Sequence, residues 1–182
     1  GTPEAGKSEF GKYLSMYIPD DENVITIEDA QEWYYKIIKP NASCIPLRVN
    51  EKMSYSEAIQ RCMRLNADRI LFTEARGSEV KDLVSLWNTG VPGLCTIHAG
   101  KYKNIPDRIL NMMPTRLDAE RLENDIYDEL DIGLIIKKKK TIDGKKMRYL
   151  DQAGFYNREN GVNTTIDLFK NHEIVTNAIP DK

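Results

Sequence analysis

The first eight residues of the chain, Gly-Thr-Pro-Glu-Ala-Gly-Lys-Ser, match the phosphate-loop pattern G-x-x-x-x-G-K-[ST] at every fixed position. Gly6 lets the backbone approach a polyphosphate closely, so that successive N–H groups form an anion-binding nest. Lys7 would then reach the β- and γ-phosphates, and the Ser8 hydroxyl would bind Mg²⁺. Apolar residues at helical spacing from Phe10 to Ile18 predict an amphipathic helix after the loop, and its N-terminus adds positive potential there.

Two features of this loop leave a second interpretation open. Glu4 places a carboxylate where many phosphate loops have glycine. A phosphate loop also normally follows a buried strand, and the sequence has no residue ahead of Gly1. We therefore expect either that the chain is a fragment or that something outside it holds the loop. A chance glycine-rich turn before a helix is the alternative.

The composition is typical of an ordinary soluble globular domain. The chain has 182 residues, 41% hydrophobic and 30% charged, which is enough for one sizeable core. A formal net charge of −2 gives no sign of a basic nucleic-acid footprint. No apolar run approaches the ~20 residues of a membrane span. Cys44, Cys62 and Cys95 have no metal-type spacing, so we expect reduced packing residues of a cytosolic protein.

Three short apolar runs, at residues 24–27, 70–72 and 94–97, predict buried strands. Side chains that can do chemistry follow each run. They are Glu28 and Asp29 after the first, Glu74 after the second and His98 after the third. Ligands bind at the carboxyl ends of parallel strands in open α/β sheets, so we expect these groups and the phosphate loop at one edge of a sheet. Taken singly, a helix-capping carboxylate or a structural histidine also explains each of them.

Further patterns complete an α/β order. Residues 45–49 alternate in polarity and include Pro46, which predicts a half-buried edge strand. Ser54 and Glu57 form a capping box, so a helix should begin there and run to about Leu65. Its inward-facing residues would be Tyr55, Ile59, Cys62 and Met63. Helical periodicity returns at residues 78–87 and 119–130.

Extended runs replace the helical ones from Asp131 onward. Asp143-Gly144 lies between two such runs and is a strong hairpin signal. Residues 164–169 and 174–175 look like further short strands. The four lysines at residues 137–140 indicate a charged, protected strand end. A patch that binds a membrane or a nucleic acid is the alternative.

Three further segments resemble the sequence boxes of secretion and traffic ATPases. These are the hexameric motors of type II and type IV secretion, of conjugation, and of type IV and tight-adherence pili. Residues 25–32 look like their Asp box, residues 67–79 are similar to their atypical Walker B box, and residues 88–99 are similar to their His box. With the phosphate loop, all four boxes occur in the family order between Gly1 and about Leu110.

The resemblance implies an α/β fold of the RecA-like P-loop NTPase type. It implies a single domain over residues 1–182, with a mixed, mostly parallel sheet and antiparallel strands after Asp131. Family members carry another domain ahead of the phosphate loop, and we expect that this domain and the strand before the loop are missing here. Glu4, Thr73 and Ala75 depart from the residues common in the family, but none of these departures removes a chemical group.

The resemblance also implies an ATPase that uses ATP and Mg²⁺ to drive conformational change. The intact protein would be a homo-hexamer in the cytoplasm, peripheral at the inner face of the cytoplasmic membrane and partnered by inner-membrane secretion or pilus machinery. It would have no direct nucleic-acid site and no transmembrane segment. The alternative is a truncated, catalytically silent α/β domain with a structural or interaction role. A small-molecule kinase is disfavoured, since no motif for a phosphoryl acceptor accompanies the loop.

Carried over residue by residue, the resemblance assigns roles to the polar groups. The nucleotide would be bound by Gly1, Gly6, Lys7, Ser8 and Arg76. Mg²⁺ would be held by Ser8 and Asp29, partly through water. The catalytic residues would be Glu74, which positions the attacking water, Glu28 as the second candidate for that work, and His98, which reports the γ-phosphate to the ring. Candidates to complete a neighbouring subunit's site are Arg48, Arg61, Arg64 and Arg76, each of which could instead be an ordinary surface residue.

Overall fold

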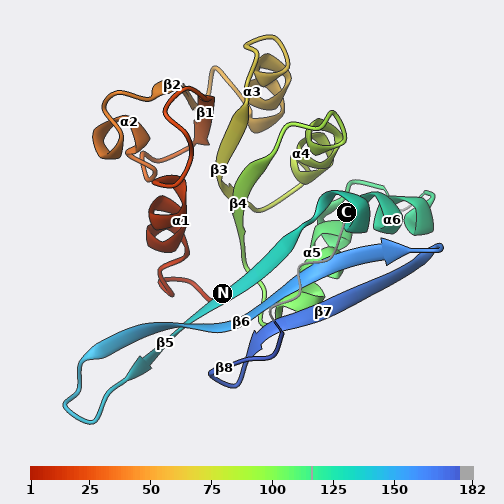
Figure 1. Ribbon diagram of the computed structural model, residues 1–182. Helices are drawn as coiled ribbons and strands as arrows, with labels where there is room; N and C mark the ends of the chain where they lie inside the picture. The colour runs from red at the N-terminus through yellow and green to blue at the C-terminus, as the bar shows by residue number, and fades with distance from the viewer. Residues whose placement is uncertain (116, 177–182) are drawn as a thin grey trace. The chain divides into compact units, whose positions relative to one another are not determined.

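The computed structural model describes residues 1–115 and 117–176, which form two compact units. Unit 1 comprises Gly1–Lys7 and the chain from His98 onward, and unit 2 comprises Ser8–Ile97. The chain passes from unit 1 to unit 2 between Lys7 and Ser8, and it returns to unit 1 between Ile97 and His98. Figure 1 shows the helices and strands of both units.

Unit 2 contains a parallel sheet of four strands in the order β2-β1-β3-β4 (Figure 1). The strands are β1 (Asn23–Glu28), β2 (Ser43–Arg48), β3 (Arg69–Ala75) and β4 (Gly93–Ile97). The two central strands are the most apolar, and burial on both faces explains why they read as continuous runs. The predicted buried strands at residues 24–27 and 70–72 are therefore confirmed, as is the edge position of the strand that contains Pro46. The third run forms the strand β4, but the prediction that it is buried is wrong, because β4 lies at the other edge of the sheet and all of its residues are only half-buried.

Unit 2 contains four α-helices, and α3 begins at the residue that its capping box predicts. They are α1 (Lys7–Ser15, whose first residue belongs to unit 1), α2 (Tyr35–Ile38), α3 (Tyr55–Cys62) and α4 (Val80–Trp87). The capping box at α3 is confirmed, because the Ser54 side chain accepts from the Glu57 N–H while the Glu57 carboxylate accepts from the Ser54 N–H. The prediction that Met63 faces inward is wrong. Helix α3 ends at Cys62, and Met63 is 62% exposed.

In one apolar cluster of unit 2, the loop after β1 packs against residues of β1 and β3. Its buried members are Ile18, Val24, Trp33, Tyr35, Ala42 and Leu71. Trp33 packs tightly under α1, since a Cβ placed on Gly11 would lie 2.7 Å from the Trp33 ring. This packing pins the loop that follows β1 against α1, and the site depends on that loop.

Unit 1 contains an antiparallel sheet in the order β5-β6-β7-β8 and two helices. The elements are the 3₁₀ turn Tyr102–Asn104, α5 (Ile105–Met112), α6 (Ala119–Glu129), β5 (Ile132–Lys140), β6 (Lys146–Glu159), β7 (Val162–Lys170) and β8 (Glu173–Ile174). The predicted hairpin is confirmed, with Gly144 at a φ of 78° in the turn between β5 and β6. The antiparallel strands form a sheet of their own, separate from the parallel one.

Aromatic rings fill the core of unit 1. Tyr102 and Tyr156 are buried, and the Tyr156 hydroxyl donates to the Tyr102 carbonyl at 2.6 Å. Gly133 and Gly154 make room for these rings, since a Cβ at either position would lie within 2.3 Å of a tyrosine atom. Within residues 1–115 and 117–176, no helix has both the length and the apolar character that crossing a membrane requires.

Candidate functional site

The phosphate loop in unit 1 has the backbone geometry that its glycines predict. Gly6 has a φ of 95°, a conformation that glycine adopts at little cost. Gly1 lies against β5, where a Cβ would come within 2.3 Å of the Ile136 carbonyl oxygen. Glu4 also has a positive φ, of 57°, and its side chain is exposed. The loop is thus a compact turn that leads directly into α1.

Lys7 and His98 meet within unit 1 although 91 positions separate them. Lys7 Nζ lies 3.2 Å from His98 Nδ1, and the same ring nitrogen lies 3.1 Å from the Gly1 carbonyl oxygen. When Nδ1 carries a proton it donates to Gly1, and when it carries a lone pair it accepts from Lys7. The protonation of one ring atom therefore decides whether His98 bonds the loop backbone or the lysine ammonium.

Arg76 joins two of the predicted carboxylates in unit 2. Its Nε donates to Glu74 Oε2 at 2.8 Å, and its Nη1 donates to Asp29 Oδ2 at 2.9 Å. β1 and β3 are paired neighbours, so the carboxyl ends of these strands lie side by side as expected. Burial alone would raise the pKa of Asp29, but the Ala30 N–H and the charge of Arg76 outweigh it and lower that pKa.

Glu28 is buried and binds the loop that follows β1 with its carboxylate. One oxygen accepts from the Thr26 hydroxyl at 2.8 Å. The other accepts from the backbone N–H groups of Glu32 at 2.7 Å and Trp33 at 2.9 Å. These bonds fix the direction of the loop. A role for Glu28 in positioning water stays a prediction, and that role would have to coexist with the three bonds.

Ser8 contacts a carboxylate that the sequence motifs did not single out. Its hydroxyl donates to Glu32 Oε2 at 2.6 Å. Glu32 is held there because its own N–H binds Glu28 and its neighbour Trp33 packs under α1. The available signal was its place as the last residue of the segment that resembles an Asp box. Only the fold shows that this end of the segment reaches Ser8.

The oxygen atoms around Ser8 fit a Mg²⁺ ion that is bound mainly by a nucleotide. A hydroxyl and a carboxylate are the hard ligands that Mg²⁺ prefers, and this ion usually keeps several waters and takes only one or two protein ligands. In the part of the chain that the structure describes, no group of three or more histidine, cysteine, aspartate or glutamate side chains could hold a metal by itself. Ser8 and the nearby Glu32 carboxylate match a site in which the protein supplies only one or two ligands.

The four arginines predicted as candidates for a neighbouring subunit's site differ in their surroundings. Arg48, Arg61 and Arg64 are exposed on unit 2, whereas Arg76 is bonded to the carboxylates of Glu74 and Asp29.

All three cysteines are free thiols and none is fully exposed, as expected for packing residues. Burial raises the pKa of Cys62 to about 11 and of Cys95 to about 12, which keeps both thiols protonated and unreactive at neutral pH.

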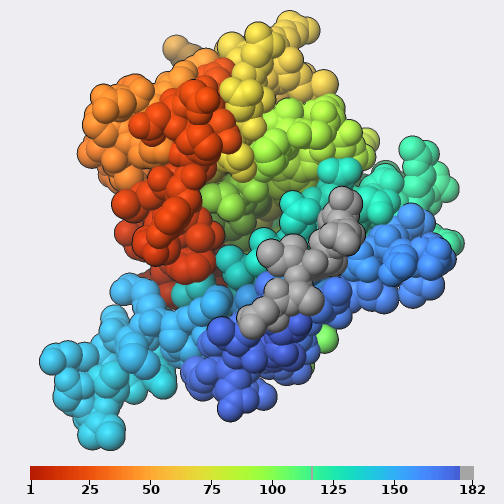
Figure 2. Space-filling model, in the orientation of Figure 1, coloured from red at the N-terminus to blue at the C-terminus, as the bar shows by residue number. Residues whose placement is uncertain are grey.

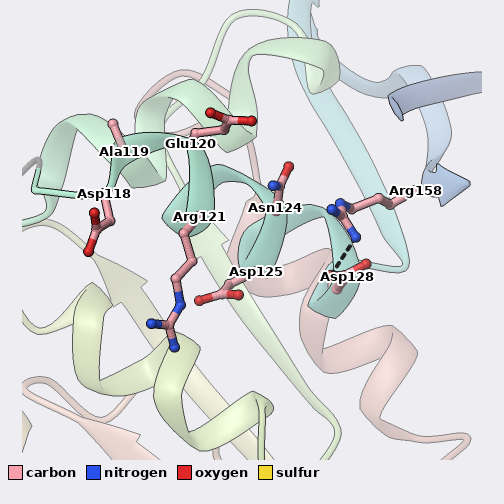
Figure 3. A pocket seen from close by; sticks show the side chains of 8 residues that line it. All are labelled: Asp118, Ala119, Glu120, Arg121, Asn124, Asp125, Asp128 and Arg158. Carbon is pink, nitrogen blue, oxygen red and sulfur yellow. Dashed lines mark ion pairs between the residues drawn. The ribbon is translucent and has the colours of Figure 1, made fainter. Parts of the chain in front are cut away.

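An open hollow of about 520 Å³ lies along α6 in unit 1, and none of the residues predicted for the site lines it (Figure 3). Its lining is mostly charged, and Arg158 pairs with Asp128 across it at 3.6 Å. Arg121 and Asp125 project from the helix into the same region (Figure 3). The hollow has few apolar walls and lacks the enclosed character of a small-molecule pocket.

Comparisons with known proteins find similarity to proteins of bacterial secretion systems. A family model described as type II/IV secretion system protein matches residues 1–132. The VirB11 type IV secretion system protein of Bartonella henselae is 28% identical over 154 residues, which is 80% of this chain and 42% of that protein.

Two solved structures resemble the fold. The VirB11 ATPase of the Brucella suis type IV secretion system, in complex with sulphate, has a TM-score of 0.71 at 22% identity, and the match covers 85% of this chain and 46% of that one. The pilus retraction motor PilT with bound ADP has a TM-score of 0.61 at 23% identity, with 76% and 39% covered. These likenesses show a RecA-like α/β fold. The chain spans less than half the length of each of these relatives.

Proposed function

Because this chain belongs to the type II/IV secretion system protein family, we propose that it is the ATP-hydrolysing part of a secretion, conjugation or pilus-assembly motor. ATP and water would be converted to ADP and phosphate, and the resulting conformational change would drive transport or assembly. Units 1 and 2 would together make up one ATPase domain. The alternative of a catalytically silent domain is not favoured, because the relatives are named as an ATPase and a motor.

The contact between Lys7 and His98 carries the proposal. It places an ammonium group and an imidazole beside a glycine loop with the geometry of an anion-binding nest. A polyphosphate is a stronger acceptor for the Lys7 ammonium than a neutral ring nitrogen is, so it would compete with His98 for Lys7. A phosphate that takes up Lys7 would leave His98 Nδ1 to donate to the Gly1 carbonyl. His98 is in this way suited to report whether the γ-phosphate is present.

Unit 2 supplies the groups that would act on metal and water. Ser8, with Glu32 beside it, would hold Mg²⁺, and Asp29 would order the waters of the ion. Mg²⁺, when bound, would neutralise charge on the phosphates. Arg76 holds Glu74 through a half-exposed ion pair. Glu74 would position the attacking water, and Arg76 would help to bind the nucleotide.

The assembly follows from the family. The relatives are named as a type IV secretion ATPase and a pilus retraction motor, and from them we propose a homo-hexamer in the cytoplasm. It would lie at the inner face of the cytoplasmic membrane, against the secretion or pilus machinery. Arg48, Arg61 and Arg64 are exposed, as a residue that completes a neighbouring subunit's site must be.

The proposal is tested with Mg²⁺-ATP and the complete protein. We expect calorimetry to detect binding by the wild type, and Lys7→Ala to weaken it at least tenfold, since charge-assisted bonds to phosphate are lost. Glu74→Gln should still bind ATP but hydrolyse it about a hundredfold more slowly. Glu51→Gln, which neutralises an exposed acid of unit 2, is the matched control. Absence of binding by the wild type would refute the ATPase function, and undiminished turnover by Glu74→Gln would refute the role of that residue.

A further inference from the structure

One face of the β5–β6 hairpin carries four cations in two cross-strand pairs. In the antiparallel register Lys138 lies opposite Arg148, and Lys140 lies opposite Lys146. Directly opposed residues share a face of the sheet, and so do residues two apart on a strand. We name these four residues the basic face. Figure 2 shows the hairpin as a narrow, light-blue arm that extends beyond β7 and β8 of its own sheet.

The arrangement of the basic face costs stability unless an anion balances it. Like charges directly opposite each other on a sheet are destabilising, and here two such pairs are adjacent. Among the salt bridges of the described residues, the basic face makes only one, from Lys138 to Glu4 at 2.8 Å. Two acids of the hairpin, Asp143 and Asp151, pair with Lys145 and Lys137, which lie outside the basic face.

Glu4 therefore links the basic face to the phosphate loop within unit 1. The hydrogen bond from Lys138 lowers the pKa of Glu4, and the charges of Lys138, Lys146 and Arg148 lower it further. Glu4 thus lies within the field of three cations of the basic face. This is the loop position where the sequence departs from the glycine common in phosphate loops. At this position the Glu4 carboxylate supplies the negative charge next to these cations.

Arg148 lies directly across the loop glycine. A Cβ placed on Gly6 would lie 2.6 Å from Arg148 Cδ and 3.0 Å from its Nε. The aliphatic part of the Arg148 side chain thus covers Gly6. The Nε atom of its guanidinium lies next to the loop backbone that would form the anion nest. Lys140 and Lys146 lie two residues farther along their strands, about 7 Å from the Lys138–Arg148 pair. The inner pair makes the direct contacts with the loop, since Lys138 bonds Glu4 and Arg148 lies against Gly6, while Lys146 acts on Glu4 through its charge.

We propose that Lys138 and Arg148 form an additional phosphate-binding element of the nucleotide site, occupied by the Glu4 carboxylate when no ligand is bound. This inference rests on the proposed ATPase function. A nucleoside polyphosphate displaces Glu4, takes the guanidinium of Arg148 as a planar, two-pronged donor and relieves the repulsion between the paired cations. Lys140 and Lys146 extend the positive field outward and raise the rate at which the anion arrives.

The test measures ATP affinity of the complete protein by calorimetry. Arg148→Ala should weaken binding about tenfold or more, because a hydrogen-bonded charge pair is lost. Arg148→Lys, which keeps the charge and loses the fork, should weaken it less. Glu4→Gln should strengthen binding, because the competing anion is removed. Lys139→Ala is the matched control, since Lys139 lies on the opposite face of the same strand and opposite Met147. It should leave the affinity within about twofold.

The outcomes separate this inference from the proposed function. If the wild type binds ATP, Lys7→Ala does not, and Arg148→Ala binds as the wild type does, the inference is overturned while the ATPase function stands. The inference is likewise overturned if Lys139→Ala and Arg148→Ala weaken binding equally, or if Glu4→Gln weakens it. If the wild type itself does not bind, both fail. Should Arg148→Ala not fold, Arg148→Lys and Glu4→Gln decide the matter on their own.

Discussion

The two sheets use their charged residues in opposite ways. In the parallel sheet of unit 2, the carboxylates at the strand ends are bound to neighbours, with Glu28 accepting three hydrogen bonds and Glu74 and Asp29 sharing Arg76. In the antiparallel sheet of unit 1, the basic face sets like charges opposite each other with one exposed acid beside them.

This difference distinguishes charged groups that stabilise the fold from charged groups that we propose bind a ligand. A buried carboxylate with three donors offsets its desolvation only through those bonds, so its removal costs stability. Exposed cations in like-charged pairs contribute no such bonds to the fold, so their removal should cost affinity and leave stability equal or higher. Mutations that compare the two regions test this distinction directly.

The largest effect is expected at Glu28. Glu28→Ala would leave the Thr26 hydroxyl and the Glu32 and Trp33 N–H groups without their acceptor in a buried place. We expect a loss of about 3 kcal/mol in the free energy of unfolding, measured with denaturant, because each unsatisfied buried donor costs about 1–3 kcal/mol. Arg148→Ala, which removes a charge from unit 1, is the comparison and should change stability by about 0.5 kcal/mol or less. A cost below about 1 kcal/mol for Glu28→Ala would contradict the role assigned to its bonds.

A smaller effect is expected from Asp29, through pH. Its pKa in the folded state lies below the usual 3.8, so its ionised form stabilises the fold above that pH and the contribution is lost as pH falls through the folded value. Because its side chain is 33% exposed, the contribution should be about 1 kcal/mol or less. Asp29→Asn should therefore be less stable than the wild type at about pH 6, and the two should converge as the pH falls below the folded-state pKa of Asp29. A gap that stays constant across this range would mean that the charge of Asp29 contributes nothing.

Much of the fold and part of the site were predictable because the signals are local. Continuous apolar runs identify β1 and β3, the Ser54 capping box identifies the start of α3, and Asp143-Gly144 identifies the hairpin. The groups at the strand ends follow from topology, since parallel neighbours end at one edge. The exposure of Met63 was not predictable, because the helical pattern continues past the point where the backbone leaves the helix.

The contacts that distant segments make could not be predicted from periodicity. The pairing of Glu4 with Lys138 joins residues 134 positions apart, and it depends on the strand register of a hairpin that has an irregularity between Ile135 and Ile136. A shift of one residue in that register would turn the lysines to the other face. Ser8 and Glu32 likewise meet because Trp33 packs against Gly11, which is a property of the packed core.

The smallest effect, and the sharpest comparison of the two regions, is expected from reversing one charge on the basic face. Lys140→Glu would convert the like-charged pair with Lys146 into an attractive one. We expect the free energy of unfolding to rise by about 0.2–1 kcal/mol at low salt, the range of cross-strand charge pairs. The gain should shrink in about 1 M salt, where the Debye length falls to about 3 Å. Lys139→Glu, opposite the uncharged Met147, is the control and should give no comparable gain. A loss of stability in Lys140→Glu, or an equal gain in both variants, would mean that the paired cations of unit 1 impose no strain on the hairpin and that its charges resemble those of unit 2 after all.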